Sequence, residues 1–411
     1  MNRYRWFLSL VLFLFPAIWL FFYFEKGFSI IPWSSDIIFI DLHTITDSVD
    51  SIRAGLNPYN DTSFDILSRT YNYPKIWLNI FDFLGLNGEK TNIVGPILIF
   101  IFFVCNVTMF RPSNPNELFL GLLVLLSPPV LLLIERCNSD IIIFSLICLG
   151  VLILATDWFC KNYLFAFLIL LGSILKLYPI FVLPSIFFLR MSKAIRLVTF
   201  ISVLLLFVSY IYLNIENYLF VVSNTPLASS LSYGRNVFLQ SFFSGIKLQM
   251  LTLGFCLLII AGAFTRVFYL KRGVNSVLDK MYANTTFTNR TFWLVGSLIY
   301  VGTFILGNSW NYRLVFLIFT LPILSRNYQL FYVRAYILCL LCLLYLDFIA
   351  NTKISQEIGT YLIFHGLHQL ISWIVFYFLS VGIAYMGKHI LKEFWPSLVI
   401  YLLPKYKTKL L

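Results

Sequence analysis

The sequence predicts an all-α protein that crosses a membrane many times. Of its 411 residues, 60% are hydrophobic and only 12% are charged. In a soluble domain about half of the residues are apolar and about a quarter are charged. The mean hydropathy is +0.85. The apolar residues form blocks of roughly twenty, the length of a membrane-spanning helix. A membrane β-barrel would show short alternating segments instead. We therefore expect one integral-membrane domain over residues 1–411.

The net charge of +12 would suggest a nucleic-acid partner in a soluble protein. In a membrane protein it instead reflects the excess of Lys and Arg in cytoplasmic loops, so we expect no nucleic acid. The seven cysteines include only one, Cys137, that looks exterior. The odd number and the lack of an exterior pair argue against a disulfide framework, and no spacing suggests a metal site.

The first predicted span covers residues 6–24 and follows Arg3 and Arg5. Without a small-residue cleavage site after it, we interpret it as an uncleaved anchor with a cytoplasmic N-terminus. The eleven further predicted spans are 93–110, 118–134, 141–156, 162–175, 180–189, 195–213, 248–268, 291–306, 312–324, 336–350 and 367–386. These twelve spans make 25–92 and 214–247 exterior loops and 388–411 a cytoplasmic tail. Most Lys and Arg then lie on the cytoplasmic side and most Asp and Glu outside.

Residues 162–189 could form either one broken helix or two short spans. One broken helix would send Arg190, Lys193 and Arg196 outside, so we predict two short spans around residues 176–179. Ionisable side chains are nearly absent from the middle of the spans, where a charge costs roughly 2.5–3.5 kcal/mol. They gather near the exterior ends. Without a buried charge relay or an internal repeat, the sequence does not favour a transporter.

The first exterior loop, 25–92, is expected to contain two helices. Residues 41–54 place Ile45, Val49 and Ile52 on one stripe, and Gly55 ends the helix. His43, Asp47 and Asp50 fall on another stripe, which we interpret as a solvated face. Residues 74–86 predict a second helix that lies in the membrane interface. The alternative, in which 74–86 crosses the membrane, would invert every later span.

Several short motifs share this exterior side. Asp41-Leu42 is followed by Arg53-Ala54-Gly55-Leu56-Asn57-Pro58-Tyr59 and Tyr71-Asn72-Tyr73-Pro74, and later come Glu135-Arg136-Cys137-Asn138-Ser139-Asp140, Lys176-Leu177-Tyr178-Pro179 and Asn311-Tyr312-Arg313. In this order they resemble GT-C glycosyltransferases, more narrowly the family 87 group of polyprenol-phosphate-mannose-dependent mannosyltransferase-like proteins. Cys137 stands where that pattern usually has Gly, and Lys75 stands where it has a second Pro.

The resemblance implies a transferase that takes one hexose, mannose-like, from a polyprenyl-phosphate donor. The acceptor would be a lipid-linked or cell-envelope glycan, as in polysaccharide biosynthesis. The implied site faces the exterior of a bacterial cytoplasmic membrane, the course is inverting, and an Asp is the general base. The leaving lipid phosphate needs cationic stabilisation. No metal and no other cofactor is expected, and the chain has no nucleotide-binding motif.

The resemblance makes Asp41 the general base, with Asp36 as its rival and Asp47 and Asp50 as weaker candidates. For Arg136 two interpretations stay open: an ion pair with Glu135 at a helix end, or a contact with the donor phosphate. Lys176 and Arg313 are assigned to the same phosphate. The alternative for Lys176 is that it snorkels from a short helix, and the alternative for Arg313 is that it anchors the chain at the membrane interface.

Further candidates for substrate contacts are His43, Tyr59, Asn138, Asp140, Tyr178, Tyr312, Arg235, His365 and His368. Arg235 would gate the acceptor, unless it only solvates its loop. His365 and His368 lie one helical turn apart, a spacing that more commonly reflects packing than metal binding.

Two other functions remain as alternatives. A polysaccharide polymerase would join repeat units rather than single sugars, and it also has many spans and an active exterior loop. A lipid or glycan flippase would need no catalytic base at all. Replacing Asp41 separates these classes, because a flippase would keep its transport.

Overall fold

A computed structural model describes residues 3–26, 37–226, 228, 230–240, 243–269 and 274–402. Helices make up 77% of the structure, which confirms the predicted helical class. The predicted rival base Asp36 lies outside the described residues.

The elements succeed one another in chain order. The first half contains α1 (Arg3–Lys26), α2 (Ile40–Arg53), α3 (Lys75–Phe83), η1 (Gly88–Lys90), α4 (Thr91–Met109), α5 (Pro115–Leu125), α6 (Pro128–Arg136), α7 (Asp140–Ile153), α8 (Lys161–Leu175), η2 (Tyr178–Phe188) and α9 (Lys193–Leu213). The second half contains α10 (Ile215–Asn224), β1 (Ser232–Tyr233), α11 (Gly245–Phe268), α12 (Val274–Ala283), α13 (Phe287–Leu306), β2 (Ser309–Trp310), η3 (Asn311–Thr320), α14 (Leu321–Arg326), α15 (Phe331–Ala350), α16 (Lys353–Ile358) and α17 (Tyr361–Leu402).

Among the described residues, six helices are long and apolar enough to cross a membrane: α1, α4, α9, α11, α15 and α17. The pair α5 and α6 is a seventh candidate, but it bends by 49°. The bend falls where Pro128 and Pro129 come after Ser127, because proline cannot continue a helix. The span predicted for 118–134 is therefore bent at this point, and the total of twelve spans stays a prediction.

Short and irregular helices replace several expected spans. The predicted break near Lys176 is confirmed, but the next element is the 3₁₀ helix η2 rather than an α-helix. Similarly, the predicted span 312–324 is the 3₁₀ helix η3 and then the short α14. Every residue of η3 but Arg313 is buried. Such segments are tolerated at membrane depth because the protein around them excludes lipid.

The two predicted exterior loops contain more structure than expected. Helix α3 has nine residues, about 14 Å in length, which is short for a bilayer core of about 30 Å and favours the interfacial interpretation of 74–86. Residues 214–247 form α10 and the strand β1, which pairs antiparallel with β2. This pairing joins the second exterior loop to the segment that carries Arg313. Helix α17 runs to Leu402, so the first part of the predicted tail 388–411 is helical.

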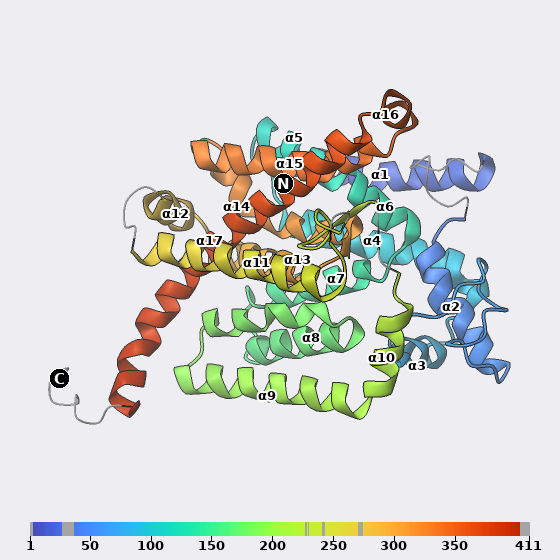
Figure 1. The fold of residues 1–411 in the computed structure, drawn as a ribbon, viewed down its shortest axis with the longest axis horizontal. Coiled ribbons are helices and arrows are strands. Elements are labelled where there is room, and N and C mark those ends of the chain that lie inside the picture. Colours follow the sequence, from blue (N-terminus) through green and yellow to red (C-terminus); the bar gives the residue numbers. More distant parts are fainter. Residues whose placement is uncertain are drawn as a thin grey trace.

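Figure 1 shows how the two ends of the bundle differ. The helices α2, α3 and α10 gather at one end, and α12 and the last turns of α17 lie at the other (Figure 1). The core between them is rich in aromatic rings, such as the stacked pair Phe144 and Phe319 with ring centroids 4.4 Å apart. Gly296 of α13 lies so close to η3 that an added Cβ would be 2.6 Å from the carbonyl oxygen of Phe316.

We predict that Gly296→Ala destabilises the protein by roughly 1–3 kcal/mol, because a backbone carbonyl cannot move aside as a side chain can. Thermal unfolding of the detergent-purified protein measures the effect. Gly262→Ala is the matched control, since nothing lies within 4 Å of a Cβ there. A Gly296 variant as stable as this control would contradict the close packing of α13 on η3.

Candidate functional site

The start of α2 is fixed to the end of α6. The backbone N–H of Phe39 donates to the carbonyl of Glu135 at 2.8 Å, and Phe39 has a left-handed φ of 58°. Its ring covers Gly95 of α4, where a Cβ would be 2.6 Å from it. This contact places Asp41, in the first turn of α2, opposite the last residue of α6.

A sharp turn after α6 provides the other side of the site. Cys137 has a left-handed φ of 44°, a backbone conformation that favours Gly. The Cys137 side chain is 1% exposed, so it is packed inside the protein, and its place on the exterior side stays a prediction. The turn reverses the chain into α7, and as a result Arg136, Asn138 and Asp140 lie near one another.

Asp41 accepts hydrogen bonds at both carboxylate oxygens. Arg136 binds it in a bidentate manner, Nη2 to Oδ1 at 2.7 Å and Nε to Oδ2 at 3.0 Å. The side-chain amide of Asn138 donates to Oδ2 at 2.6 Å. The alternative pairing of Arg136 with Glu135 is therefore not the one observed. A carboxylate with this many donors is held in its ionised form.

Asp140 is the centre of a second group of charges. Lys176 donates to its Oδ1 at 2.5 Å and Tyr178 donates to the same oxygen at 2.7 Å. The Nε of Arg313 lies 3.8 Å from the other oxygen, Oδ2. Among the described residues, neither this Nε nor this Oδ2 has a hydrogen-bond partner. Arg313 therefore retains an unused donor inside the site.

Asn138 connects the two groups. Its amide donates to Asp41, and its Oδ1 accepts from Lys176 at 2.9 Å. The structure thus brings together seven of the residues expected from the sequence, which we call the Asp41 cluster: Asp41, Arg136, Asn138, Asp140, Lys176, Tyr178 and Arg313.

Two members of the site were missed by sequence reasoning. Arg69 lies 3.7 Å from Asp41 and also pairs with Asp65 at 3.1 Å. Burial of Tyr73 raises the pKa of its phenol well above the ordinary value, and the nearby negative charges of Asp41 and Asp140 raise it further. The Tyr73 motif was noted in the sequence, whereas nothing in the sequence pointed to Arg69.

The accessible surface of the site is cationic. The side chains of Asp41 and Asp140 are only 8% and 0% exposed, whereas those of Arg136, Arg69 and Arg313 are 28%, 28% and 18% exposed. Counting Asp65 and Lys176, four cations face three carboxylates. An incoming ligand would therefore meet mainly guanidinium groups, which suit phosphate.

The pKa of Asp41 reflects two opposing effects. Burial alone raises the pKa of its carboxyl, but the charge and hydrogen bonds of Arg136 lower it, helped by Asn138 and Arg69. The net result is a pKa below the ordinary value of 3.8. Asp41 is therefore ionised at neutral pH.

The other acids of α2 have structural roles. Asp47 pairs with His43 at 3.0 Å, and it is 6% exposed. Asp50 accepts from the backbone of Gly88 at 2.9 Å and from Asn87 at 3.1 Å. The interpretation of this face as solvated was wrong, because η1 covers it. His43 is bound to Asp47 and is not part of the Asp41 cluster.

Tyr59 and Tyr312 border the cluster. Tyr59 donates to the carbonyl of Tyr73 at 3.0 Å and accepts from Asn217 at 2.6 Å, and burial raises the pKa of its phenol to about 12. Tyr312 is 8% exposed and stacks on Trp310. Both tyrosines are placed to shape the walls of the site.

Arg235 is not a solvated loop residue, and its role as a gate for the acceptor stays a prediction. It donates to the carbonyl of Ile305 at 2.5 Å, to Gln249 at 2.6 Å and to Thr252 at 2.6 Å. Only 8% of it is exposed. It therefore fixes the predicted second exterior loop between α11 and α13.

His365 has a partner that the sequence did not reveal. Its Nδ1 lies 2.8 Å from Asp347, which is fully buried and also accepts from Asn311 at 2.7 Å. Asn311 begins η3, so this pair supports the segment that carries Arg313. His368 is buried, 6.5 Å from the ring of His365. Among the described residues, no group of three His, Cys, Asp or Glu side chains could hold a metal ion.

No family model, curated protein or solved structure matches the chain. The assignment to a family is therefore a proposal, and the functional argument depends on the geometry of the site.

We predict that Asp41→Asn lowers stability by about 1–3 kcal/mol, because it leaves the Arg136 guanidinium without its counter-ion. The loss has a defined pH dependence. The pKa of Asp41 is lower in the folded protein than in the unfolded protein, where it is about 3.8. Its carboxylate therefore stabilises the fold at any pH above the unfolded pKa. This contribution disappears as the pH falls through the folded pKa.

The measurement is thermal unfolding of both proteins between pH 7 and pH 3. We expect their difference in Tm to stay constant down to about pH 5 and to shrink below about pH 4. A difference that closes between pH 7 and pH 5 would show that the pKa of Asp41 is raised instead.

Proposed function

We propose that the chain is a GT-C-type hexosyltransferase of the bacterial cytoplasmic membrane. In this proposal it moves one mannose-like sugar from a polyprenyl-phosphate donor to a lipid-linked or cell-envelope glycan on the exterior face, and both termini are cytoplasmic. The observation that carries the proposal is the cationic surface of the Asp41 cluster beside an ionised carboxylate. The resemblance of the exterior motifs to family 87 supports the same reaction.

The cations would act on the leaving group. As the bond between the anomeric carbon and the phosphate oxygen breaks, negative charge develops on the lipid phosphate. Arg136 and Arg313 are partly exposed and can pair with phosphate oxygens, and Lys176 adds a point charge. The unpartnered Nε of Arg313 is already free to form such a bond.

Asp41 would accept the proton of the acceptor hydroxyl as that oxygen attacks the anomeric carbon. In the structure both of its oxygens are bound, so one must first be released. An anionic phosphate competes with Asp41 for Arg136, and transfer of the guanidinium to the phosphate would free a carboxylate oxygen. Loss of this counter-ion also raises the pKa of Asp41 and makes it a stronger base.

The Asp41 cluster gathers its charges into one connected network, which suits a fixed reaction site. A flippase would move a charged headgroup across the membrane core. The polymerase alternative shares this reaction chemistry and differs in the size of the acceptor and donor, so chain length of the product separates the two.

We predict that Arg136→Gln and Arg313→Gln each weaken binding of a polyprenyl phosphate about tenfold, the typical effect of losing a charge-assisted hydrogen bond. Competition against a fluorescent polyprenyl phosphate in detergent measures the Kd. Arg53→Gln is the matched control, because Arg53 forms an exposed surface pair with Asp82. Equal affinities for all three variants would remove the cluster as the phosphate site.

We predict that Asp41→Asn retains binding of polyprenyl phosphate and lowers the rate of sugar transfer by about 10²–10⁴. Defined polyprenyl-phosphate hexoses and a glycolipid acceptor, with product analysis, provide the assay. Asp82→Asn serves as the control, since that carboxylate is exposed and pairs with Arg53 on the surface of α3. Full transfer by the Asp41 variant would rule out its role as base.

A further inference from the structure

A polar cavity of about 390 Å³ lies at the end of the bundle away from the Asp41 cluster. It opens between α12, α13 and α17, with Phe188 of η2 in its wall. Helix α13 has 20 residues, begins beside the cavity at Phe287 and ends at Leu306 near η3, so it spans about 30 Å. Figure 1 likewise places α12 and α2 at opposite ends. The cavity is therefore separate from the proposed transferase site.

Cationic side chains lie around this cavity. Arg290 lines it together with the imidazole of His389, and Arg190 stacks on the ring of Phe287 in its wall at 5.1 Å. Lys388 and Lys392 lie within electrostatic range of His389. Asp279 is the one carboxylate among the lining residues that the structure describes, and it accepts a hydrogen bond from Tyr385. The local charge is thus positive and suits an anion.

A buried phenol provides an unused hydrogen-bond donor. Tyr282 lines the cavity and is 7% exposed, and among the described residues its hydroxyl has no hydrogen-bond partner. Its ring is held between Tyr385, stacked at 5.3 Å, and Trp293 at 5.8 Å. A buried hydroxyl without an acceptor is unfavourable, and a phosphate oxygen in the cavity would supply one.

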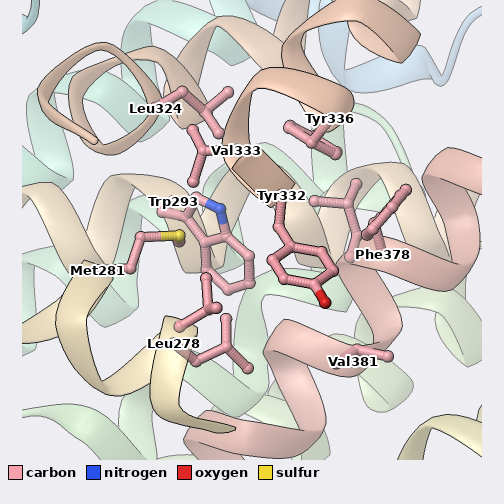
Figure 2. A pocket seen from close by; sticks show the side chains of 11 residues that line it. Leu278, Met281, Trp293, Leu324, Tyr332, Val333, Tyr336, Phe378 and Val381 are labelled. Atoms are coloured by element: carbon pink, nitrogen blue, oxygen red, sulfur yellow. The ribbon is translucent and has the colours of Figure 1, made fainter. Parts of the chain in front are cut away.

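An apolar pocket of about 80 Å³ lies next to the polar cavity. Helices α12, α13 and α17 contribute walls to both, and the contact between Trp293 and Tyr282 joins them. Figure 2 shows Met281, Leu278, Trp293, Tyr332 and Val381 around the apolar pocket. A ligand that fills both spaces has an anionic head and a hydrocarbon chain.

We propose that the two cavities form a binding site for an anionic phospholipid. Its phosphate occupies the polar cavity, with Arg290 and the hydroxyl of Tyr282 as donors, and one acyl chain enters the apolar pocket. The expected topology places this end of the bundle at the cytoplasmic leaflet, where basic pockets between helices bind anionic headgroups. The site is independent of the proposed transfer reaction.

The test uses the full chain in neutral detergent, with phosphatidylglycerol as the probe and binding monitored by native mass spectrometry. Arg290→Gln should weaken binding about tenfold and Tyr282→Phe about fivefold. Arg111→Gln is the control, because Arg111 is an exposed cation that donates to the carbonyl of Thr108. If the Arg290→Gln variant does not fold, the affinity of the Tyr282→Phe variant for phosphatidylglycerol still tests the proposal.

Two further ligands complete the test. Phosphatidylcholine shows whether the headgroup must be anionic, and inorganic phosphate shows whether the lipid chains are needed. Phosphatidylcholine with the same acyl chains should bind at least tenfold more weakly, and equal binding would overturn the anionic site. Inorganic phosphate should not raise the Tm at the concentration at which phosphatidylglycerol does. Equal protection by inorganic phosphate, or native affinity in both variants, would overturn the proposal.

Discussion

The bidentate ion pair between Asp41 and Arg136 is the interaction on which the rest of the site depends. It joins two helices whose paired residues are 95 positions apart in the chain, and the hydrogen bond from Phe39 to Glu135 lies directly beside it. Removing Arg136 would take away the bidentate partner of the buried Asp41 carboxylate, and removing Asp41 would take away the counter-ion of Arg136. The pair therefore fixes the first exterior loop on the bundle, and the loop in turn brings Arg69 and Tyr73 to the site.

The gathering of the cluster could be predicted from the sequence, because the membrane interior excludes charge. Asp41, Arg136, Lys176 and Arg313 lie in different segments, but all had to lie at helix ends on one side. The pairing itself could not be predicted. Asn138 and Asp140 turn out to connect two groups of charges, an arrangement that depends on the left-handed turn at Cys137. His365 was assigned to packing because its partner Asp347 comes from another helix.

Hydropathy predicted the long helices with exposed apolar surfaces well. It predicted the helices that are surrounded by protein poorly. Helices such as α9 and α11 expose much of their apolar surface, so composition alone identifies them. The 3₁₀ helices η2 and η3 are surrounded by protein, and their conformation depends on neighbours rather than on local sequence. The loop helices α10, α12 and α16 are short and are stabilised by tertiary contacts, which a periodicity argument does not detect.

Two groups of cationic side chains thus lie at opposite ends of one helical bundle, and the proposed transfer reaction is assigned to the group that contains Asp41. The most direct test of the central claim is photo-crosslinking with a polyprenyl phosphate that carries a diazirine beside its phosphate, with peptide mapping of the labelled protein. The account predicts that label concentrates on the residues around Lys176, Tyr178 and Arg313 and is competed by unlabelled polyprenyl phosphate. Label that is confined to other segments, or that resists competition, would contradict it.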